Sequence, residues 1–404
     1  MLYDLANTIF TLVGGLYFAT YLTTNGAPDA YLSAANVVAM SVVIVLGPWI
    51  GAVTDHRGRR LPVLVWGTLV TVGATALLGT VGLVPSLAFF AVALIGFNLA
   101  GVVYDALLPD VAAPGDIGRV SGIGVGVGYI GSFIAIGIGA VVDALGWAPT
   151  TVFPIIAAAF LVFAIPTFLL VREPPRPARS GPPPTLRRAV RHLIEAWGRA
   201  RRVPGVARFL VGRFLYTDAI NTLTGGFLAI FAIQELGYTD AEVRALLATS
   251  IVTSIAGGLV ASRLVDRVGP RRYLHSMLYV WMAAMAFGIA IAVTGWTAPV
   301  CFPGTDACMR LEALLLGMAG GVALAGVWAS DRPYMAALSP IESYGEFYGL
   351  YGTVGRFATL FGPALWAIIV DGLDLPRTVA LGSLIVALVA ARLVLQKVPQ
   401  VANA

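Results

Sequence analysis

Long apolar stretches, separated by short polar connections, follow one another along almost the whole chain of 404 residues. Most continue for about 20 residues, the length at which an α-helix crosses the hydrocarbon core of a bilayer. A membrane β-barrel would show short segments of alternating polarity instead. We expect twelve helical spans, at residues 3–22, 30–53, 62–81, 86–108, 118–142, 149–171, 205–235, 241–265, 273–295, 311–336, 345–370 and 376–397. The sequence therefore predicts an all-α polytopic membrane protein.

One longer polar stretch divides the predicted spans into two sets of six. It begins with a proline-rich part, which is typical of a flexible linker. It continues as a segment in which Leu186, Val190 and Trp197 recur at helical spacing among arginines, a pattern that predicts an amphipathic helix on an anionic membrane surface. We therefore expect a six-helix bundle at 1–171, a linker at 172–204 and a second bundle at 205–404.

The composition narrows the class of function. Because 58% of the residues are hydrophobic and only 12% are charged, the chain cannot form the polar surface of a water-soluble domain. The net charge of +5 comes from arginines in short loops, which does not indicate nucleic-acid binding. The three histidines are scattered, and the sequence has no nucleophile motif and no ATP-binding loop. We expect a monomer that is not an enzyme and uses no cofactor, metal or nucleic acid.

The loop charges predict an orientation. Arginines occupy the loop after the second span, the linker (nine of them) and the loop after the eighth span, whereas the alternate loops carry mostly acids. The positive-inside rule then places both termini and the linker in the cytoplasm. The first apolar segment begins at once, so we expect no cleavable signal peptide. Apolar helix precedes Asp218 in the seventh span, whereas only three residues precede Asp4. Either the first helix starts abruptly or the natural chain starts upstream of Met1, and we expect the second. The expected location is the cell membrane of a bacterium.

The two cysteines, Cys301 and Cys308, lie in one loop that this orientation places outside the cell. In an oxidising compartment, two neighbouring cysteines favour a disulfide over a pair of free thiols.

Short strings recur in the two halves. Asp4-Leu5-Ala6-Asn7-Thr8 opens the first span, and Asp218-Ala219-Ile220-Asn221-Thr222 lies in the seventh. Asp55 stands three residues before Gly58, as Asp266 stands three before Gly269, and arginines follow both glycines. Two halves of one plan, each with a carboxylate in an apolar helix, indicate a transporter built from repeats.

The second of these repeats resembles a signature of the major facilitator superfamily, the loop between helices 2 and 3. The first copy consists of Gly51, Asp55, Gly58, Arg59 and Arg60, and the second of Asp266, Arg267, Gly269 and Arg271. The resemblance implies two six-helix bundles that move a small molecule by rocker-switch alternating access, with helices 1, 4, 7 and 10 around a central cavity. It also implies that the motif acts as a cytoplasmic latch; a plain positive-inside stop signal is the alternative.

A narrower resemblance is to the vacuolar amino-acid effluxers of fungal autophagy and their bacterial relatives. The strings that carry it are Tyr3–Asn7, Arg213–Asp218, Glu346–Tyr351 and Arg356-Phe357 leading to Gly362-Pro363, whereas Ser330-Asp331-Arg332-Pro333-Tyr334 departs from the family pattern. The resemblance implies export of amino acids. An exporter of drugs or other lipophiles, and a non-transporting sensor or assembly protein with a transporter fold, are the alternatives.

Charged and amide side chains inside the predicted spans are the candidate substrate or proton site: Asp4, Asn7, Arg213, Asp218, Asn221, Asp331, Arg332 and Arg356. Charges in the bilayer core are costly, and they commonly mark ion or substrate pathways. A buried carboxylate can take up a proton or a substrate amine. The structural alternative is that each acid only pairs with an arginine, Asp218 with Arg213 or Arg356 and Asp331 with Arg332. The expected partners are a small solute, protons and membrane lipids.

Overall fold

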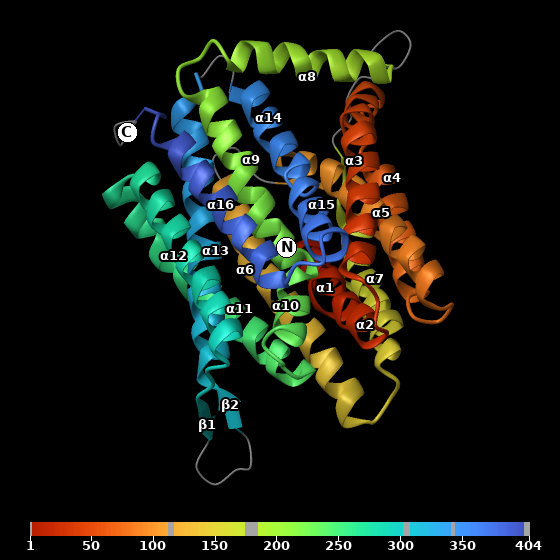
Figure 1. Ribbon diagram of the computed structural model, residues 1–404. Helices are drawn as coiled ribbons and strands as arrows, with labels where there is room; N and C mark the ends of the chain where they lie inside the picture. The colour runs from red at the N-terminus through yellow and green to blue at the C-terminus, as the bar shows by residue number, and fades with distance from the viewer. Residues whose placement is uncertain (1, 112–116, 174–184, 302–307, 341–343, 400–404) are drawn as a thin grey trace. The chain divides into compact units, whose positions relative to one another are not determined.

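The computed structural model describes residues 2–111, 117–173, 185–301, 308–340 and 344–399. Regular structure in these residues is almost entirely helical (Figure 1). Ten of the described helices are long and apolar enough to cross a membrane. Helices suit this sequence because a bilayer offers the backbone no hydrogen-bond partners, so each spanning segment must satisfy its own N–H and C=O groups.

Two of the twelve expected spans are not among these ten. The span expected at 62–81 is the apolar helix α4, Leu61–Ala76, which has only 16 residues. The span expected at 205–235 is divided into α9 (Val206–Thr222), the π-helix η3 (Leu223–Phe227) and α10 (Leu228–Gln234). Helix α9 carries Arg208, Arg213 and Asp218.

The chain forms two compact units. The first contains Met1–Ala27 and Tyr31–Ile194, and the second contains Pro28–Ala30 and Glu195–Ala404, so the change from one to the other lies within α8. The elements up to that point are α1 (Leu2–Leu12), the π-helix η1 (Val13–Phe18), α2 (Ala19–Thr24), α3 (Asp29–Arg57), α4, α5 (Leu83–Val111), α6 (Ile117–Ala144), the 3-10 turn η2 (Pro149–Thr151), α7 (Val152–Leu170) and α8 (Leu186–Ala200).

The core of the first unit is aromatic. Phe18 of η1 stacks on Phe90 of α5 with ring centroids 4.2 Å apart, and Phe10 of α1 stacks on Phe160 of α7 at 5.8 Å. All four rings are buried. Helices that associate within a bilayer have no hydrophobic driving force, so their association depends on close packing. Aromatic pairs such as these add to the packing energy.

Helices α1 and α6 approach closely at small residues. The hydroxyl of Thr8 donates a hydrogen bond to the backbone carbonyl of Gly128. A Cβ atom on Gly131 would collide with the carbonyl oxygen of Leu5 and with Thr8. The glycines of α6 therefore allow close backbone contact with α1 inside the first unit.

The second unit contains most of the remaining chain. Its elements are α9 (Val206–Thr222), the π-helix η3 (Leu223–Phe227), α10 (Leu228–Gln234), α11 (Asp240–Val268), α12 (Pro270–Thr294), β1 (Pro299–Cys301), β2 (Cys308–Arg310), α13 (Leu311–Leu338), α14 (Tyr344–Phe357), α15 (Phe361–Ala367), the π-helix η5 (Ile368–Gly372) and α16 (Arg377–Leu395). The hairpin of β1 and β2 lies at the end of this unit opposite the start of α9 (Figure 1).

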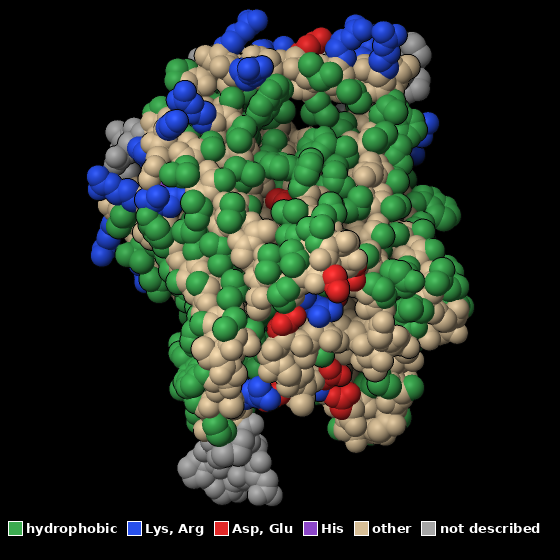
Figure 2. All heavy atoms as spheres, viewed as in Figure 1, with side chains coloured by type: hydrophobic (Ala, Val, Ile, Leu, Met, Phe, Trp, Pro, Cys, Tyr) green, Lys and Arg blue, Asp and Glu red, His purple; other side chains and the backbone are tan. Residues whose placement is uncertain are grey.

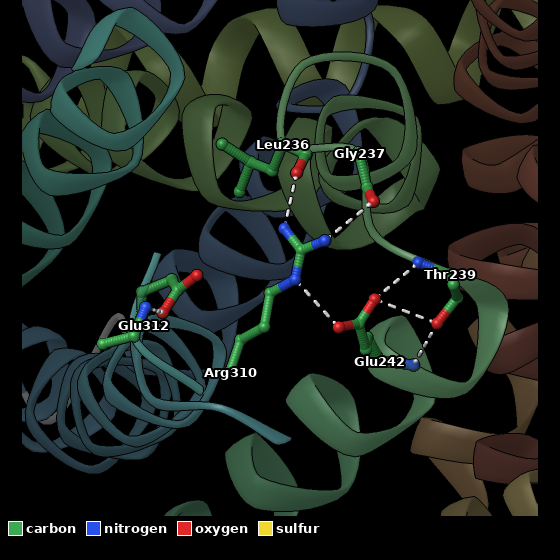
Figure 3. A network of polar contacts seen from close by, with 7 residues as sticks. Leu236, Gly237, Thr239, Glu242, Arg310 and Glu312 are labelled. Carbon is green, nitrogen blue, oxygen red and sulfur yellow. Dashed lines mark hydrogen bonds and ion pairs between the residues drawn. The ribbon is translucent and has the colours of Figure 1, made fainter. Parts of the chain in front are cut away.

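Arg310, at the end of β2, ties the hairpin to the loop between α10 and α11 (Figure 3). Its guanidinium pairs with Glu242 at 2.9 Å and donates to the carbonyl oxygens of Leu236 and Gly237. Glu242 and Thr239 form a capping box at the start of α11. Burial, and secondarily the charge of Glu312, raise the pKa of the Tyr238 phenol above its usual range, so this ring stays neutral under Arg310.

Candidate functional site

A buried ion pair joins α9 to α13. Nη1 of Arg213 lies 3.2 Å from Oδ2 of Asp331, which has no exposed surface. The hydroxyl of Tyr216, one turn along α9, also donates to Oδ2, at 3.3 Å. A buried pair is tolerated only when further polar contacts offset the desolvation of both ions, and the Tyr216 hydroxyl is one such contact.

Aromatic and hydroxyl groups enclose the arginine of this pair. The guanidinium carbon lies 3.6 Å from the ring centroid of Tyr351 on α14, and Nη1 donates to Thr217 at 3.1 Å. A Cβ atom on Gly355 would come within 3.0 Å of Nη2. The guanidinium therefore lies on the face of Tyr351, as cation–π contacts require, in a space that the glycine leaves open.

This geometry corrects the structural pairing expected from sequence. Arg213 pairs with Asp331 and not with Asp218. Arg332, which was expected to pair with its neighbour Asp331, is exposed, and Arg356 is half-buried on α14. A helix turns by about 100° per residue, so the side chains of the adjacent residues Asp331 and Arg332 point in different directions.

Asp218 lies beside the interruption of helix between α14, which ends at Phe357, and α15, which begins at Phe361. We call this interruption the break. The carboxylate accepts hydrogen bonds from the backbone N–H groups of Phe361 and Gly362, the first two residues of α15. The residue is only 7% exposed, and its Oδ1 is buried without a hydrogen-bond partner among the described residues. One side of this carboxylate thus holds the start of α15, while its other oxygen contacts no polar group among the described residues.

The opposite side of the same break is held by Asn221. Its side-chain amide donates to the carbonyl oxygen of Ala358, just after α14 ends, at 3.1 Å. Gly362 lies so close to α9 that a Cβ atom there would collide with Thr222 and come within 3.1 Å of Asp218. One turn of α9 therefore supplies partners for both backbone ends that the break exposes.

The matching string in the first unit has a different environment. Asp4 is half-buried, and its Oδ2 accepts a hydrogen bond from the hydroxyl of Tyr104 on α5 at 2.7 Å. Asn7 is half-buried on α1. The two repeats thus differ in burial and in partners, although their sequences match.

Both repeated helices continue into π-helical turns, which the sequence analysis missed. These turns, η1 and η3, each contain a pair of glycines, Gly14-Gly15 and Gly225-Gly226. π-helical turns are rare and are frequent at functional sites. The repeated Gly-Gly pair, a few residues after each Asn-Thr, is the signal that could have identified them.

In the latch motif, the structure explains the two glycines. Gly58 and Gly269 both have positive φ, 67° and 89°, directly after the last residues of α3 and α11. Only glycine adopts this conformation readily, so the fixed spacing places a helix stop in both copies.

The charged members of the motif lie at helix ends, and some of them have local partners. The N–H groups of Arg60 and Leu61 donate to Glu173 at 2.6 and 2.9 Å, so this carboxylate lies at the start of α4. Nη2 of Arg271 donates to the backbone oxygen of Gln396. Gly51 is half-buried, and Arg59, Asp266 and Arg267 are exposed. The side chain of Asp55 lies outside the described residues, and the latch stays a prediction.

The backbone of the hairpin places Cys301 directly opposite Cys308. Both side chains lie outside the described part of the chain, so the disulfide stays a prediction that this register permits.

Comparison with known proteins shows the family to which the chain belongs. The family model described as "Vacuole effluxer Atg22 like" matches residues 115–398. The uncharacterized MFS-type transporter YxiO of Bacillus subtilis is 26% identical over 99% of this chain and 94% of its own length. Autophagy-related protein 22 of Coccidioides immitis is 25% identical over 63% of this chain, but the match covers only 44% of that protein.

Solved structures support the same fold. The nucleoside transporter NupG superposes with a TM-score of 0.68 over 98% of each chain, at 13% identity. A bacterial homologue of the human lysosomal transporter Spinster gives a TM-score of 0.61 over 98% of this chain and 92% of that one, at 16% identity. The chain is therefore a multi-pass membrane transporter with the major facilitator fold, and it belongs to the Atg22-like vacuole effluxer family.

Proposed function

We propose that the protein is a secondary active transporter of a bacterial cell membrane that exports small polar or amphipathic solutes, such as amino acids, in exchange for protons. The observation that carries the proposal is the Asp218 carboxylate, which is buried and has one oxygen without a partner among the described residues. An unpaired charge in a low-dielectric site is costly, so the carboxylate gains by binding a proton or a cationic amine.

The exchange follows from competition for this oxygen. A proton neutralises Asp218 and removes its attraction for an ammonium group, and an ammonium group on the ionised carboxylate excludes the proton. Each ligand therefore favours release of the other, which is the requirement for antiport when the two bundles alternate access. The export direction is supported by the description of the family as effluxers.

The nearby ion pair supports Asp218 as the group that binds the ligand. Arg213 lies on the same helix α9, but it already has Asp331 as its counter-ion. The charge of Asp218 is therefore left for a proton or the ammonium group of a solute.

Uptake into proteoliposomes with an imposed pH gradient tests the proposal. Labelled amino acids, a nucleoside and a lipophilic cation are offered separately to the purified full-length protein and to Asp218→Asn. We expect gradient-driven uptake of at least one amino acid, and its loss in the variant. Asp374→Asn is the matched control, because this exposed loop residue has a positive φ that asparagine also tolerates. Equal uptake by Asp218→Asn would remove Asp218 from coupling, and uptake of the lipophilic cation alone would favour a drug exporter.

A further inference from the structure

The linker helix α8 has two apolar edges in different surroundings. A helix turns by about 100° per residue, so residues four positions apart share an edge. One edge consists of small buried side chains: Ala189, Ala196 and Ala200. The other consists of large exposed side chains: Leu186, Val190 and Ile194, the last of them 66% exposed. The helix therefore packs through its small residues and presents its large apolar residues outward.

Arginines border the exposed edge. Arg187 and Arg191 each follow a residue of this edge by one position, and both are exposed. Four arginines and one glutamate lie within the helix, so its net charge is +3 (4 − 1) with His192 neutral. Figure 2 shows basic side chains gathered over α8. A stripe of apolar side chains next to a row of arginines is the pattern of a helix at a lipid headgroup boundary.

The direction of α8 agrees with such a location. In Figure 1, the end of α8 that belongs to the second unit, from Glu195 to Ala200, runs across the direction of α9 rather than along it. The connection is a tight turn, in which Arg201 donates to the carbonyl of Trp197 at 3.0 Å and Val206 to that of Val203 at 3.4 Å. We expect residues 205–235, which begin with α9, to cross the membrane, so a helix that runs across α9 lies along the membrane surface.

We infer that the exposed edge of α8 binds acidic phospholipids. Leu186, Val190 and Ile194 enter the upper acyl region, and Arg187 and Arg191 contact headgroup phosphates of the cytoplasmic leaflet. A protein partner fits less well, because three side chains over two turns are far fewer than the roughly 20 residues a side of a stable protein interface. The lipid contact fixes the depth at which α9 enters the membrane, whichever solute is carried.

Lipid retention by the full-length protein tests the charge requirement. The protein in detergent is titrated with phosphatidylglycerol or phosphatidylcholine, and bound lipid is counted by native mass spectrometry. We expect selective retention of phosphatidylglycerol and a loss of affinity of about fivefold for each of Arg187→Gln and Arg191→Gln. Arg188→Gln removes the same charge from the far side of the helix and should retain the lipid. Equal losses in all three variants, or equal retention of phosphatidylcholine, would overturn the inference.

The depth of the exposed edge is tested separately, in nanodiscs that contain phosphatidylglycerol. Spin labels are attached to Ile194→Cys or Arg188→Cys in a chain whose Cys301 and Cys308 are replaced by serine. We expect the label at 194 to collide more with oxygen, which concentrates in lipid, and the label at 188 to collide more with a water-soluble nickel chelate. If both labels meet the nickel chelate equally, α8 faces water and the proposal fails.

Discussion

The two buried carboxylates of the second unit differ in whether they have a counter-ion. Each keeps one buried oxygen without a hydrogen-bond partner among the described residues. Asp331 has the guanidinium of Arg213 and the hydroxyl of Tyr216 on its other oxygen, whereas Asp218 accepts from two backbone N–H groups only. A pair that neutralises itself is suited to structure, and a carboxylate without a counter-charge is suited to binding. This difference separates a framework role for Asp331 from a ligand role for Asp218.

The Arg213–Asp331 pair gives a stability prediction. Asp331→Asn leaves the Arg213 guanidinium buried without its counter-ion, which typically costs about 3–5 kcal/mol. We expect a clear fall in the thermal unfolding temperature in detergent. The double variant Arg213→Met/Asp331→Leu removes both charges and should regain much of this loss. A double variant as unstable as the single one would show that the pair itself contributes net stability.

Sequence reasoning found these residues but not their arrangement. The apolar runs of the chain predict helices directly, and the Asp-x-x-Asn-Thr repeat marks Asp4 and Asp218 as related. The repeat did not show that Asp218 is buried while Asp4 is only half-buried, because burial depends on which helices pack around each copy. Arg213 was expected near Asp218, its neighbour on α9, but its partner comes from α13, and no local pattern encodes that contact.

Helix breaks are the main structural feature at the scale of elements. The segment from α14 to η5 was expected as one continuous span, but α14 ends at Phe357 and α15 begins at Phe361. Gly362-Pro363 is the local signal, since proline has no N–H to donate to residue 359 and is readily placed in the first turn of a helix. Hydrogen bonds from α9 hold both ends of the break: Asp218 accepts from the first N–H groups of α15, and Asn221 donates to the carbonyl of Ala358 after α14.

A glycine substitution tests this contact. Gly362→Ala places a Cβ atom against Thr222 and should push α15 away from α9, removing the hydrogen bonds to Asp218. We expect a lower unfolding temperature and loss of transport, with partial recovery when Thr222→Ala is added. Gly349→Ala, on α14, is the control because a Cβ atom there meets nothing within 4 Å. Unchanged stability in Gly362→Ala would mean that α15 moves freely against α9.

At the scale of the whole molecule, the chain consists of two units and a linker helix with one expected orientation. Arginines mark the loops predicted to be cytoplasmic, and the hairpin of the second unit lies at the opposite end from the start of α9. The orientation thus follows from loop charge. The sequence also predicts α8 as an amphipathic helix at the membrane surface, and the structure adds which of its apolar residues are exposed.

Sidedness can be measured with a membrane-impermeant maleimide on right-side-out vesicles. We expect Cys301 and Cys308 to react only after reduction, because the predicted disulfide faces outward. A cysteine introduced by Arg188→Cys should react only when the vesicles are opened. Reaction at position 188 from outside would invert the topology, and reaction of the hairpin cysteines without reduction would exclude the disulfide.

The exchange of a proton for a solute at Asp218 is tested most directly by proton movement itself. Proteoliposomes are loaded with a pH-sensitive dye, without any initial pH gradient, and a solute that the protein transports is added on one side. We predict a solute-dependent change of internal pH for the unmodified protein and for Asp374→Asn, and none for Asp218→Asn. Proton movement that persists in Asp218→Asn, or solute flux in the unmodified protein without any proton movement, would contradict the mechanism.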